Sequence, residues 1–318
     1  MKISVVIPCY RSERTLPSVV EETIRVLEER DSIDYEIILV DDGSPDGTLD
    51  TIRSLCRNPR VKGIALARNF GQPCASLAGF AAVTGDVVVY SDDDGQTPID
   101  HLWPLVDRLA EGSDIVFATF SAQTQSPLQR IGRVLNNLMA THLIGKPKHL
   151  HFGNFWVCRR FIVDEAVKFK NPYPYMGGIF VRTTRHMSEV QTNHRPRAAG
   201  RSNYSTRKMI SLWLNGFTAF SIVPLRMATG LGVAIAVIGF LFALRLSVEK
   251  LMNPAIQAGY SSIMATILVM GGLTISLLGV VGEYVGRIYM NINGIPQYVV
   301  RESLNLAQGT GRSGSSPT

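Results

Sequence analysis

The stretch VVVYSDDDGQTP, residues 87–98, joins an uninterrupted apolar run to three consecutive aspartates. A short run of β-branched and aromatic residues is typical of a strand that is buried on both faces of a sheet. Similar apolar runs occur at 3–7, 36–40, 61–66 and 115–117, and segments with helical spacing at 16–29, 49–57, 73–83 and 98–111 separate them. This alternation predicts repeated strand–helix–strand units and an α/β fold with a largely parallel sheet.

Polar loops follow the first four predicted strands. They cover residues 8–15, 41–47, 68–72 and 92–98. In open α/β sheets, ligands bind at the carboxyl ends of the parallel strands. We therefore expect these four loops to converge on one edge of the sheet and to form a binding site there.

The acidic turn at residues 92–94 is the strongest local signal for chemistry. Adjacent carboxylates repel one another, and hard oxygen ligands of this kind suit Mg²⁺ or Mn²⁺ bridging two phosphates. Asp92 and Asp94 are the predicted metal ligands, with Asp93 directed to the opposite side if the backbone stays extended. The alternative interpretation is an ordinary solvated turn, which the position at the binding edge disfavours.

A second acidic turn, VDDGSPD at residues 40–46, follows another predicted strand. A carboxylate in this turn can accept the imide N–H group of a uracil or bond to ribose hydroxyls. Alternatively, Ser44 or Asp46 could cap the helix that follows. Both interpretations can hold for different residues of the same loop.

The amino-acid composition limits the class of protein to which the chain can belong. The chain has 318 residues, 46% of them hydrophobic, a net charge of +6 and a mean hydropathy of +0.12. The positive hydropathy predicts a membrane-embedded segment, and the positive charge suits lipid headgroups or phosphorylated ligands. Without a basic stripe interleaved with aromatic residues, nucleic acid is not an expected partner.

The four cysteines lack metal-site spacing and are expected to be reduced thiols. The first residues are typical of a strand rather than of a signal peptide.

The C-terminal third predicts a membrane anchor. Residues 227–244 and 261–282 contain no charged side chain, and each run approaches the length that crosses a bilayer as a helix. The basic residues Arg201, Arg207, Lys208, Arg226, Arg287 and Arg301 flank the pair, against Arg245 and Lys250 in the connection. This bias places both flanks in the cytoplasm. The alternative is a buried hairpin in a soluble core.

Residues 206–224 suit an interfacial helix or an ordinary core helix. The tail from residue 308 is expected to be disordered.

Six motifs in order resemble glycosyltransferase family 2. They are IPCYRSE at 7–13, VDDGSPD at 40–46, ARNFGQ at 67–72, DDDGQTP at 92–98, GRSNYS at 200–205 and GEYVGRIY at 282–289. Within that family they are similar to the polyprenyl-phosphate sugar transferases, including dolichol-phosphate mannose synthases, bactoprenol glucosyltransferases and undecaprenyl-phosphate formamido-arabinose transferases. The likeness spans roughly residues 3–300.

The resemblance implies a domain plan. Residues 1–205 form a cytoplasmic GT-A catalytic domain with a Rossmann-like, mostly parallel sheet, and residues 206–224 form the interfacial helix. Residues 225–290 hold a two-helix transmembrane hairpin, with helices at about 227–246 and 261–283, and residues 291–318 form a cytoplasmic tail. We expect a multi-pass protein of the cytoplasmic (inner) membrane that assembles as a homo-oligomer, with a tetramer as the assembly that the family indicates.

The resemblance also implies roles for individual residues. The predicted catalytic residues are Asp92, Asp94, Gln96 and Arg197, with Asp92 and Asp94 as ligands of Mg²⁺ or Mn²⁺. The predicted donor-binding residues are Pro8, Tyr10, Asp41, Asp42, Arg68, Gln72 and Asp93. The predicted contacts of the acceptor phosphate are Arg130, Arg133, Ser202 and Tyr204. For Arg130, Arg133 and Arg197, a solvated surface position is the alternative.

Two departures from the family pattern bear on function. Arg11 and Ser12 follow Tyr10 where many relatives have Asn-Glu, so donor contacts at this loop differ from the family pattern. Asn154 stands in a segment where relatives often carry Asp. A hydroxyl acceptor would want a carboxylate base there, whereas a phosphate monoester with a second pKa of about 6 is already mostly ionised. The amide favours a phosphate acceptor, or else marks an altered or inactive site.

The predicted function is inverting transfer of a sugar from a nucleotide-sugar, expected to be UDP-linked, to a polyprenyl phosphate such as undecaprenyl phosphate. The reaction would take place at the cytoplasmic face of the membrane and supply cell-envelope glycan modification. One alternative is a polysaccharide synthase, which the small number of membrane helices disfavours. The other is a catalytically silent membrane scaffold that pairs with a flippase, which the intact acidic turn disfavours.

Overall fold

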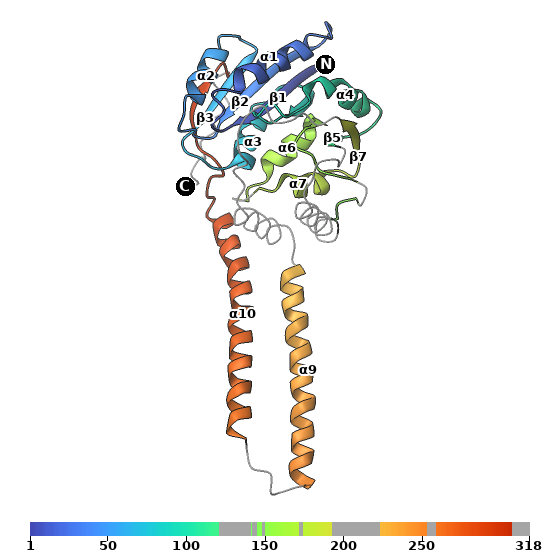
Figure 1. Ribbon diagram of the computed structural model, residues 1–318, viewed down its shortest axis with the longest axis vertical. Coiled ribbons are helices and arrows are strands. Elements are labelled where there is room, and N and C mark those ends of the chain that lie inside the picture. The colour runs from blue at the N-terminus through green and yellow to red at the C-terminus, as the bar shows by residue number, and fades with distance from the viewer. Residues whose placement is uncertain are drawn as a thin grey trace, which may run out of the picture. The chain divides into compact units, whose positions relative to one another are not determined.

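The computed structural model describes residues 1–120, 141, 145–147, 150–171, 174–192, 223–252 and 259–306. The chain divides into two compact units, one of residues 1–213 with 295–318 and the other of residues 214–294. Figure 1 shows a twisted sheet with helices in the first unit and two long helices in the second. Each unit is described by itself.

The first unit is built on a single mixed sheet. Its strands are β1 (Lys2–Cys9), β2 (Asp34–Asp41), β3 (Val61–Leu66), β4 (Val87–Tyr90), β5 (Ile115–Phe120), β6 (Trp156–Arg159), β7 (Met187–Thr192) and β8 (Val300–Leu304). They lie in the order β7-β5-β6-β4-β1-β2-β3-β8. Strands β4, β1, β2 and β3 are mutually parallel, whereas β6 and β8 pair antiparallel with their neighbours. The predicted α/β fold with a mostly parallel sheet is confirmed.

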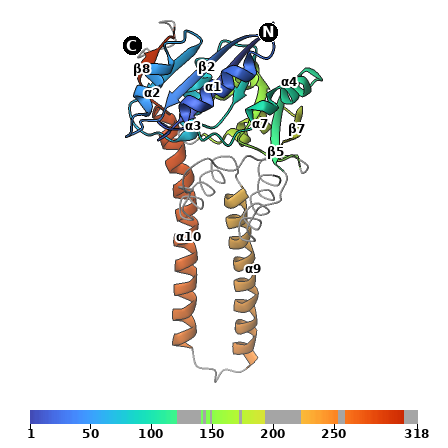
Figure 2. The same ribbon diagram turned by 45° about the horizontal axis from the view of Figure 1, so that its top comes forward.

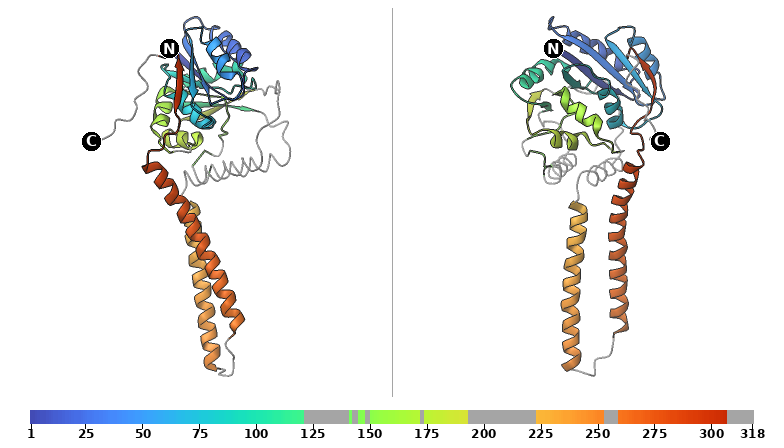
Figure 3. Two further views of the ribbon diagram at one scale, coloured as in Figure 1. Left: turned by 90° about the vertical axis from the view of Figure 1, so that its left-hand side faces the viewer. Right: turned by 180° about the vertical axis from the view of Figure 1, so that it is seen from behind.

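Helices cover both faces of this sheet. The helical segments are α1 (Leu16–Leu27), α2 (Thr48–Leu55), α3 (Gln72–Phe80), the 3₁₀ turn η1 (Ile99–His101), α4 (Leu102–Ala110), α6 (Arg160–Lys168) and α7 (Met176–Thr183). Side chains of α1 and α4 join alternate residues of β1 and β2 in one core. On the other face, α3 lies so close that a Cβ atom on Gly79 would sit 2.4 Å from Val6. Figures 2 and 3 let the layers be followed from several sides.

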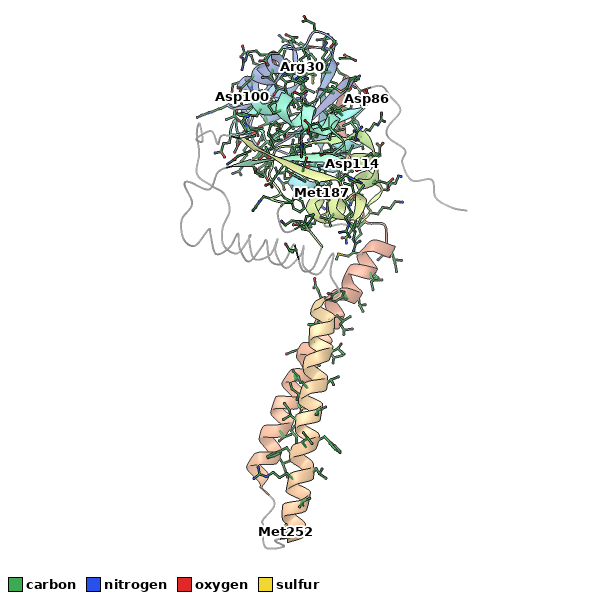
Figure 4. All side chains as sticks on the ribbon, turned by 90° about the vertical axis from the view of Figure 1, so that its right-hand side faces the viewer. Arg30, Asp86, Asp100, Asp114, Met187 and Met252 are labelled. Atoms are coloured by element: carbon green, nitrogen blue, oxygen red, sulfur yellow. The ribbon has the colours of Figure 1, made fainter. Side chains whose placement is uncertain are left out.

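The central strands are apolar throughout because neither face meets water. Val5 and Val6 of β1 point to opposite faces, as neighbours in a strand do, and both are fully buried. The same holds for Ile37 and Ile38 of β2. The outer strands look different in sequence. Residues of β7 are mostly half-exposed, and Figure 4 shows Met187 near Asp114, which precedes β5.

A buried charge holds the amino ends of the central strands together. The Glu36 carboxylate of β2 is 2% exposed and accepts hydrogen bonds from Lys62 Nζ (2.5 Å), Ser4 Oγ (2.6 Å) and the Thr84 main-chain N–H (2.6 Å). Burial works to raise the pKa of Glu36, but these donors outweigh it and lower the pKa to about 2. This end of the sheet is therefore a closed ionic cluster, opposite the edge where the polar loops lie.

The segment after the second long helix returns to the sheet. Strand β8 pairs with β3, and the guanidinium of Arg53 binds the Glu302 carboxylate at 2.6 and 3.3 Å. Asn305, with φ +56°, donates from its side-chain amide to the carbonyl oxygen of Val61 (2.9 Å). The sequence analysis assigned this segment to a tail and did not predict the strand.

The second unit consists of α9 (Val223–Met252) and α10 (Tyr260–Ile292), which lie side by side in Figures 1 and 2. Both are longer than the predicted helices. Many apolar side chains on them are exposed, among them Phe240 at 69% and Ile275 at 72%. Within the described parts of the chain, one segment, Met270–Met290, is long and apolar enough to cross a membrane, and the apolar stretch Ala228–Phe242 is shorter than a span. The predicted pair of spans is thus reduced to one by this criterion.

Candidate active site

The four polar loops meet at one edge of the sheet, as predicted. Cys9 at the end of β1 pairs with Asp41 at the end of β2, which in turn pairs with Ala65 of β3. Strand β4 lies on the other side of β1, with Tyr90 opposite Val6. The loops that follow these strands therefore lie in the spatial order β4, β1, β2, β3 along the edge.

Asp92 lies in the acidic turn after β4 and is bound by neutral side chains. Gln72 Nε2 donates to Asp92 Oδ1 (2.8 Å) and also lies 3.0 Å from the hydroxyl oxygen of Tyr90. Burial of Asp92, together with repulsion from Asp94, raises its pKa to about 7, although hydrogen bonds from Asn154 and Gln72 oppose the shift. The turn therefore holds more negative charge than its surroundings stabilise.

The residue types of this turn are those that a divalent cation prefers as ligands. Asp92 and Asp94 supply carboxylate oxygens two residues apart, and Gln96 adds an amide oxygen two residues further on. Gly95, with φ +73°, lets the chain reverse between them, and the Gln96 main-chain N–H donates to Asp94 Oδ1 (3.0 Å). Such hard ligands suit Mg²⁺ or Mn²⁺. No group of three His, Cys, Asp or Glu side chains is arranged to hold a metal within the described part of the chain.

Asp93 has a different task from its two neighbours. Its carboxylate accepts a hydrogen bond from the Tyr10 main-chain N–H (2.9 Å), and its carbonyl oxygen accepts one from the Thr15 hydroxyl (2.7 Å). The side chain is directed toward the loop after β1. Asp93 thus fastens the acidic turn to that loop, a contact that the sequence analysis did not predict.

Asp42 fastens the next pair of loops. Its two carboxylate oxygens accept the main-chain N–H groups of Phe70 (2.7 Å) and Gly71 (2.9 Å), in the loop after β3. Burial raises the pKa of Asp42, and these two donors act against the shift. Each carboxylate oxygen retains a further lone pair, so the predicted donor contact and this clamp are compatible.

Gly43 makes that clamp possible. It adopts φ +64°, which L-residues rarely adopt, and a Cβ atom there would lie 2.5 Å from the carbonyl carbon of Arg68. The loop after β3, which Asp42 clamps, is also held by the segment just before β8, because the Ala67 N–H donates to the Val299 carbonyl oxygen (2.8 Å). Arg68 is exposed, and its guanidinium lies 4.8 Å from the ring centre of Phe70.

Stacked aromatic rings lie beneath the acidic turn. Tyr90 stacks on Trp156 with ring centres 5.1 Å apart and planes within 3°, and Phe80 and Phe180 close the cluster. Through its contact with Gln72, Tyr90 links this packing to Asp92. From the sequence, Tyr90 is expected in an apolar strand, and its stacking on Trp156 is not predicted. The one available signal was the position of Tyr90 next to the acidic turn.

The structure brings most predicted site residues to this edge. The strand ends, the loops and the first residue of α3 there carry Pro8, Tyr10, Asp41, Asp42, Arg68, Gln72, Asp92, Asp93, Asp94 and Gln96. Pro8 is buried within β1, and Asp41 is also buried, accepting the Ser44 main-chain N–H (3.1 Å). The predicted residues Arg130, Arg133, Arg197, Ser202 and Tyr204 lie outside the described residues, and their roles stay predictions.

Comparison with known proteins identifies the family. Residues 4–166, about half of the chain, match the model of glycosyl transferase family 2, and this range contains the four loops at the sheet edge. This chain belongs to glycosyl transferase family 2. The family expected from the six motifs is confirmed, the fold is GT-A-like, and the protein is a glycosyltransferase.

Relatives of this glycosyltransferase match nearly its whole length. The SfII prophage-derived bactoprenol glucosyl transferase of Shigella flexneri is 32% identical over 309 residues, covering 95% of this chain and 98% of the relative. The undecaprenyl-phosphate 4-deoxy-4-formamido-L-arabinose transferase of Proteus mirabilis is 33% identical over 312 residues, covering 96% and 94%. A solved structure of glucosyl-3-phosphoglycerate synthase from Mycobacterium tuberculosis, with Mn²⁺ and UDP-glucose, covers 67% of this chain and 79% of its own at 18% identity and a TM-score of 0.47.

The raised pKa of Asp92 predicts a gain in stability for Asp92→Asn. Its folded-state pKa of about 7 exceeds the ordinary value of 3.8 for an aspartate, so at pH 8 ionised Asp92 destabilises the metal-free protein. We expect Asp92→Asn to raise the thermal midpoint at pH 8 in EDTA, and the gain to shrink at pH 5.5, where wild-type Asp92 is itself protonated. An equal or lower midpoint for Asp92→Asn at pH 8 would contradict the assignment.

Gly43→Ala is expected to destabilise the site by more than its backbone conformation alone requires. The new Cβ must displace main-chain atoms of Arg68 and Asn69, so the loop that Asp42 clamps has to move. The matched control is Gly145→Ala, because Gly145 has a similar φ of +77° but nothing within 4 Å of a new Cβ. We expect the thermal midpoint to fall further for Gly43→Ala, and equal falls for both variants would refute the steric argument.

Proposed function

We propose that this glycosyltransferase moves a sugar from a nucleotide-sugar, UDP-linked in the first instance, to a polyprenyl phosphate at the cytoplasmic face of a membrane. The observation that carries the proposal is the match along 95–96% of the chain to relatives named as bactoprenol and undecaprenyl-phosphate transferases. A match of that extent includes the C-terminal helices as well as the catalytic domain.

The site at the sheet edge supports the donor half of this reaction. Asp92, Asp94 and Gln96 would hold a divalent cation, which when bound neutralises the charge that develops on the leaving nucleoside diphosphate. The loops that Asp42 and Asp93 fasten would hold the nucleoside and diphosphate in fixed positions. Positioning and charge neutralisation by a rigid site are the main sources of catalysis in such a transfer.

Asn154 supports the acceptor half. It hydrogen-bonds to Asp92, which places an amide beside the acidic turn. An amide takes up no proton near neutral pH, so this residue provides no general base for a hydroxyl acceptor. A polyprenyl phosphate needs none, because its oxygen is already ionised and can attack the anomeric carbon in line with the leaving group, with inversion.

The chain's connectivity supports a membrane anchor with both ends on one side. The second unit, residues 214–294, is inserted between two parts of the first, and β8 pairs with β3 directly after α10. Whatever α9 and α10 cross, the chain must return to the side from which it left. Exposed apolar residues such as Phe240 and Ile275 suit contact with lipid tails better than with water. The homo-oligomer expected from the family stays a prediction.

Full-length protein in mild detergent, incubated with radiolabelled UDP-glucose, undecaprenyl phosphate and Mn²⁺, is expected to yield a chloroform-soluble glycolipid. A panel of other labelled nucleotide-sugars tests the donor in the same way. Asp94→Asn should lower the rate by about 100-fold or more, as expected when a charge-stabilising group is lost from a preorganised site.

Other outcomes separate the alternatives. A water-soluble or precipitated polymer would indicate a polysaccharide synthase instead. No transfer from any donor of the panel would contradict the proposal and favour a catalytically silent scaffold. Full activity of Asp94→Asn would leave the reaction standing but remove the acidic turn from it.

A further inference from the structure

Arg11, the first residue after Tyr10 in the loop that follows β1, adopts an unusual backbone conformation. Its φ angle is +57°, and Asn305 is the other non-glycine residue with a positive φ among those that the structure describes. Asn tolerates this left-handed region, whereas a long side chain such as that of Arg is strained there by about 1 kcal/mol. Such strain persists where the surrounding structure imposes it, and it is concentrated at binding sites.

Three consecutive main-chain N–H groups impose the conformation. Tyr10 N–H donates to Asp93 Oδ2 (2.9 Å), Arg11 N–H to Ser44 Oγ (3.2 Å) and Ser12 N–H to Thr48 Oγ1 (3.0 Å). The first acceptor belongs to the acidic turn after β4, and the other two belong to the loop and helix after β2. The loop after β1 is therefore tied on both sides, and the peptide of Arg11 is fixed in the strained region.

The side chain of Arg11 remains available at the surface of this loop. The residue is exposed, and its guanidinium carbon lies 5.4 Å from the ring centre of Tyr10, which is itself 41% exposed. The aspartates on either side already accept main-chain N–H groups, Asp93 from Tyr10 and Asp42 from Phe70. The Arg11 guanidinium is thus an exposed hydrogen-bond donor on a loop whose main chain is held in place.

The position of Arg11 along the edge indicates its ligand. Strand β1 lies between β4, which is followed by the predicted metal ligands, and β2, which ends in the predicted nucleoside contacts Asp41 and Asp42. The group of a nucleotide-sugar that joins the metal to the nucleoside is the diphosphate. A guanidinium offers paired donors to phosphate oxygens and offsets the repulsion between that diphosphate and the surrounding carboxylates.

We propose that Arg11 binds the diphosphate of the nucleotide-sugar donor, the strained backbone being the means by which the loop directs its guanidinium to the site. This inference rests on the proposed function. The phosphate of the lipid acceptor has the same chemistry, but Arg11 lies between the metal turn and the nucleoside loop, which favours the donor.

Arg11→Gly separates an effect on binding from an effect on folding. The substitution should weaken the binding of UDP without lowering the thermal midpoint. Glycine adopts φ +57° without strain, so the thermal midpoint should stay the same or rise. Loss of the guanidinium should weaken UDP binding by roughly 10- to 100-fold, the usual effect of removing a hydrogen bond to a charged group. Affinity is measured by titration calorimetry on the full chain in detergent with Mn²⁺. Arg14→Ala, which removes an equal charge from an exposed residue of the same loop, is the matched control and should bind UDP normally.

Further measurements distinguish the diphosphate of the donor from the phosphate of the lipid acceptor. Arg11→Lys should recover part of the UDP affinity, and the KM for undecaprenyl phosphate should be unchanged in Arg11→Gly. Wild-type affinity for UDP in Arg11→Gly would overturn the inference while leaving the proposed function intact. A raised KM for the lipid with unchanged UDP affinity would also overturn it, assigning Arg11 to the acceptor. Failure of the wild-type chain to bind UDP or any other nucleoside diphosphate of the donor panel would overturn the proposed function together with this inference.

Discussion

Repulsion among the aspartates at one edge of the sheet is the constraint on which the rest of the site depends. The ends of β2 and β4 and the turns that follow them bring five carboxylates to that edge, those of Asp41, Asp42, Asp92, Asp93 and Asp94. Asp42 and Asp93 are stabilised by main-chain N–H groups of neighbouring loops. Asp92 is buried beside Asp94 and accepts hydrogen bonds from the side-chain amides of Asn154 and Gln72, and burial together with repulsion from Asp94 raises its pKa to about 7. Charge that the protein itself does not compensate is the physical basis of the proposed cation site.

The same hydrogen bonds that compensate the charge also make the site rigid. Asp93 ties the acidic turn to the loop after β1, and Asp42 ties the loop after β2 to the loop after β3. The Val299 carbonyl, just before β8, then holds that last loop from outside. The residues that would bind the donor are therefore placed by a continuous network running across four strands and ending in the segment that follows α10. Preorganisation of this kind lowers the cost of orienting a substrate.

Much of the fold and part of the site could be predicted from sequence. Strands β1 to β4 are buried on both faces, so they appear as apolar runs, and the polar loops after them mark the binding edge. Strand β8, with the sequence VRESL, has no such pattern, because its pairing with β3 and the Arg53–Glu302 ion pair define it. The role of Asp93 was equally hidden. Its direction depends on the Tyr10 N–H, a contact between residues 83 positions apart. Roles of Arg130, Arg133, Arg197, Ser202 and Tyr204 rest on the family resemblance alone.

The central claim is that neighbouring aspartates of one turn divide into a cation ligand and a loop anchor. Binding of Mn²⁺ in the presence of UDP, followed by electron paramagnetic resonance on the full-length chain in detergent, tests that division most directly. The account predicts that Asp94→Asn abolishes the bound Mn²⁺ signal at concentrations that saturate the wild type, whereas Asp93→Asn retains it at a thermal midpoint below that of wild type. Undiminished Mn²⁺ binding by Asp94→Asn, or its loss only in Asp93→Asn, would contradict the account.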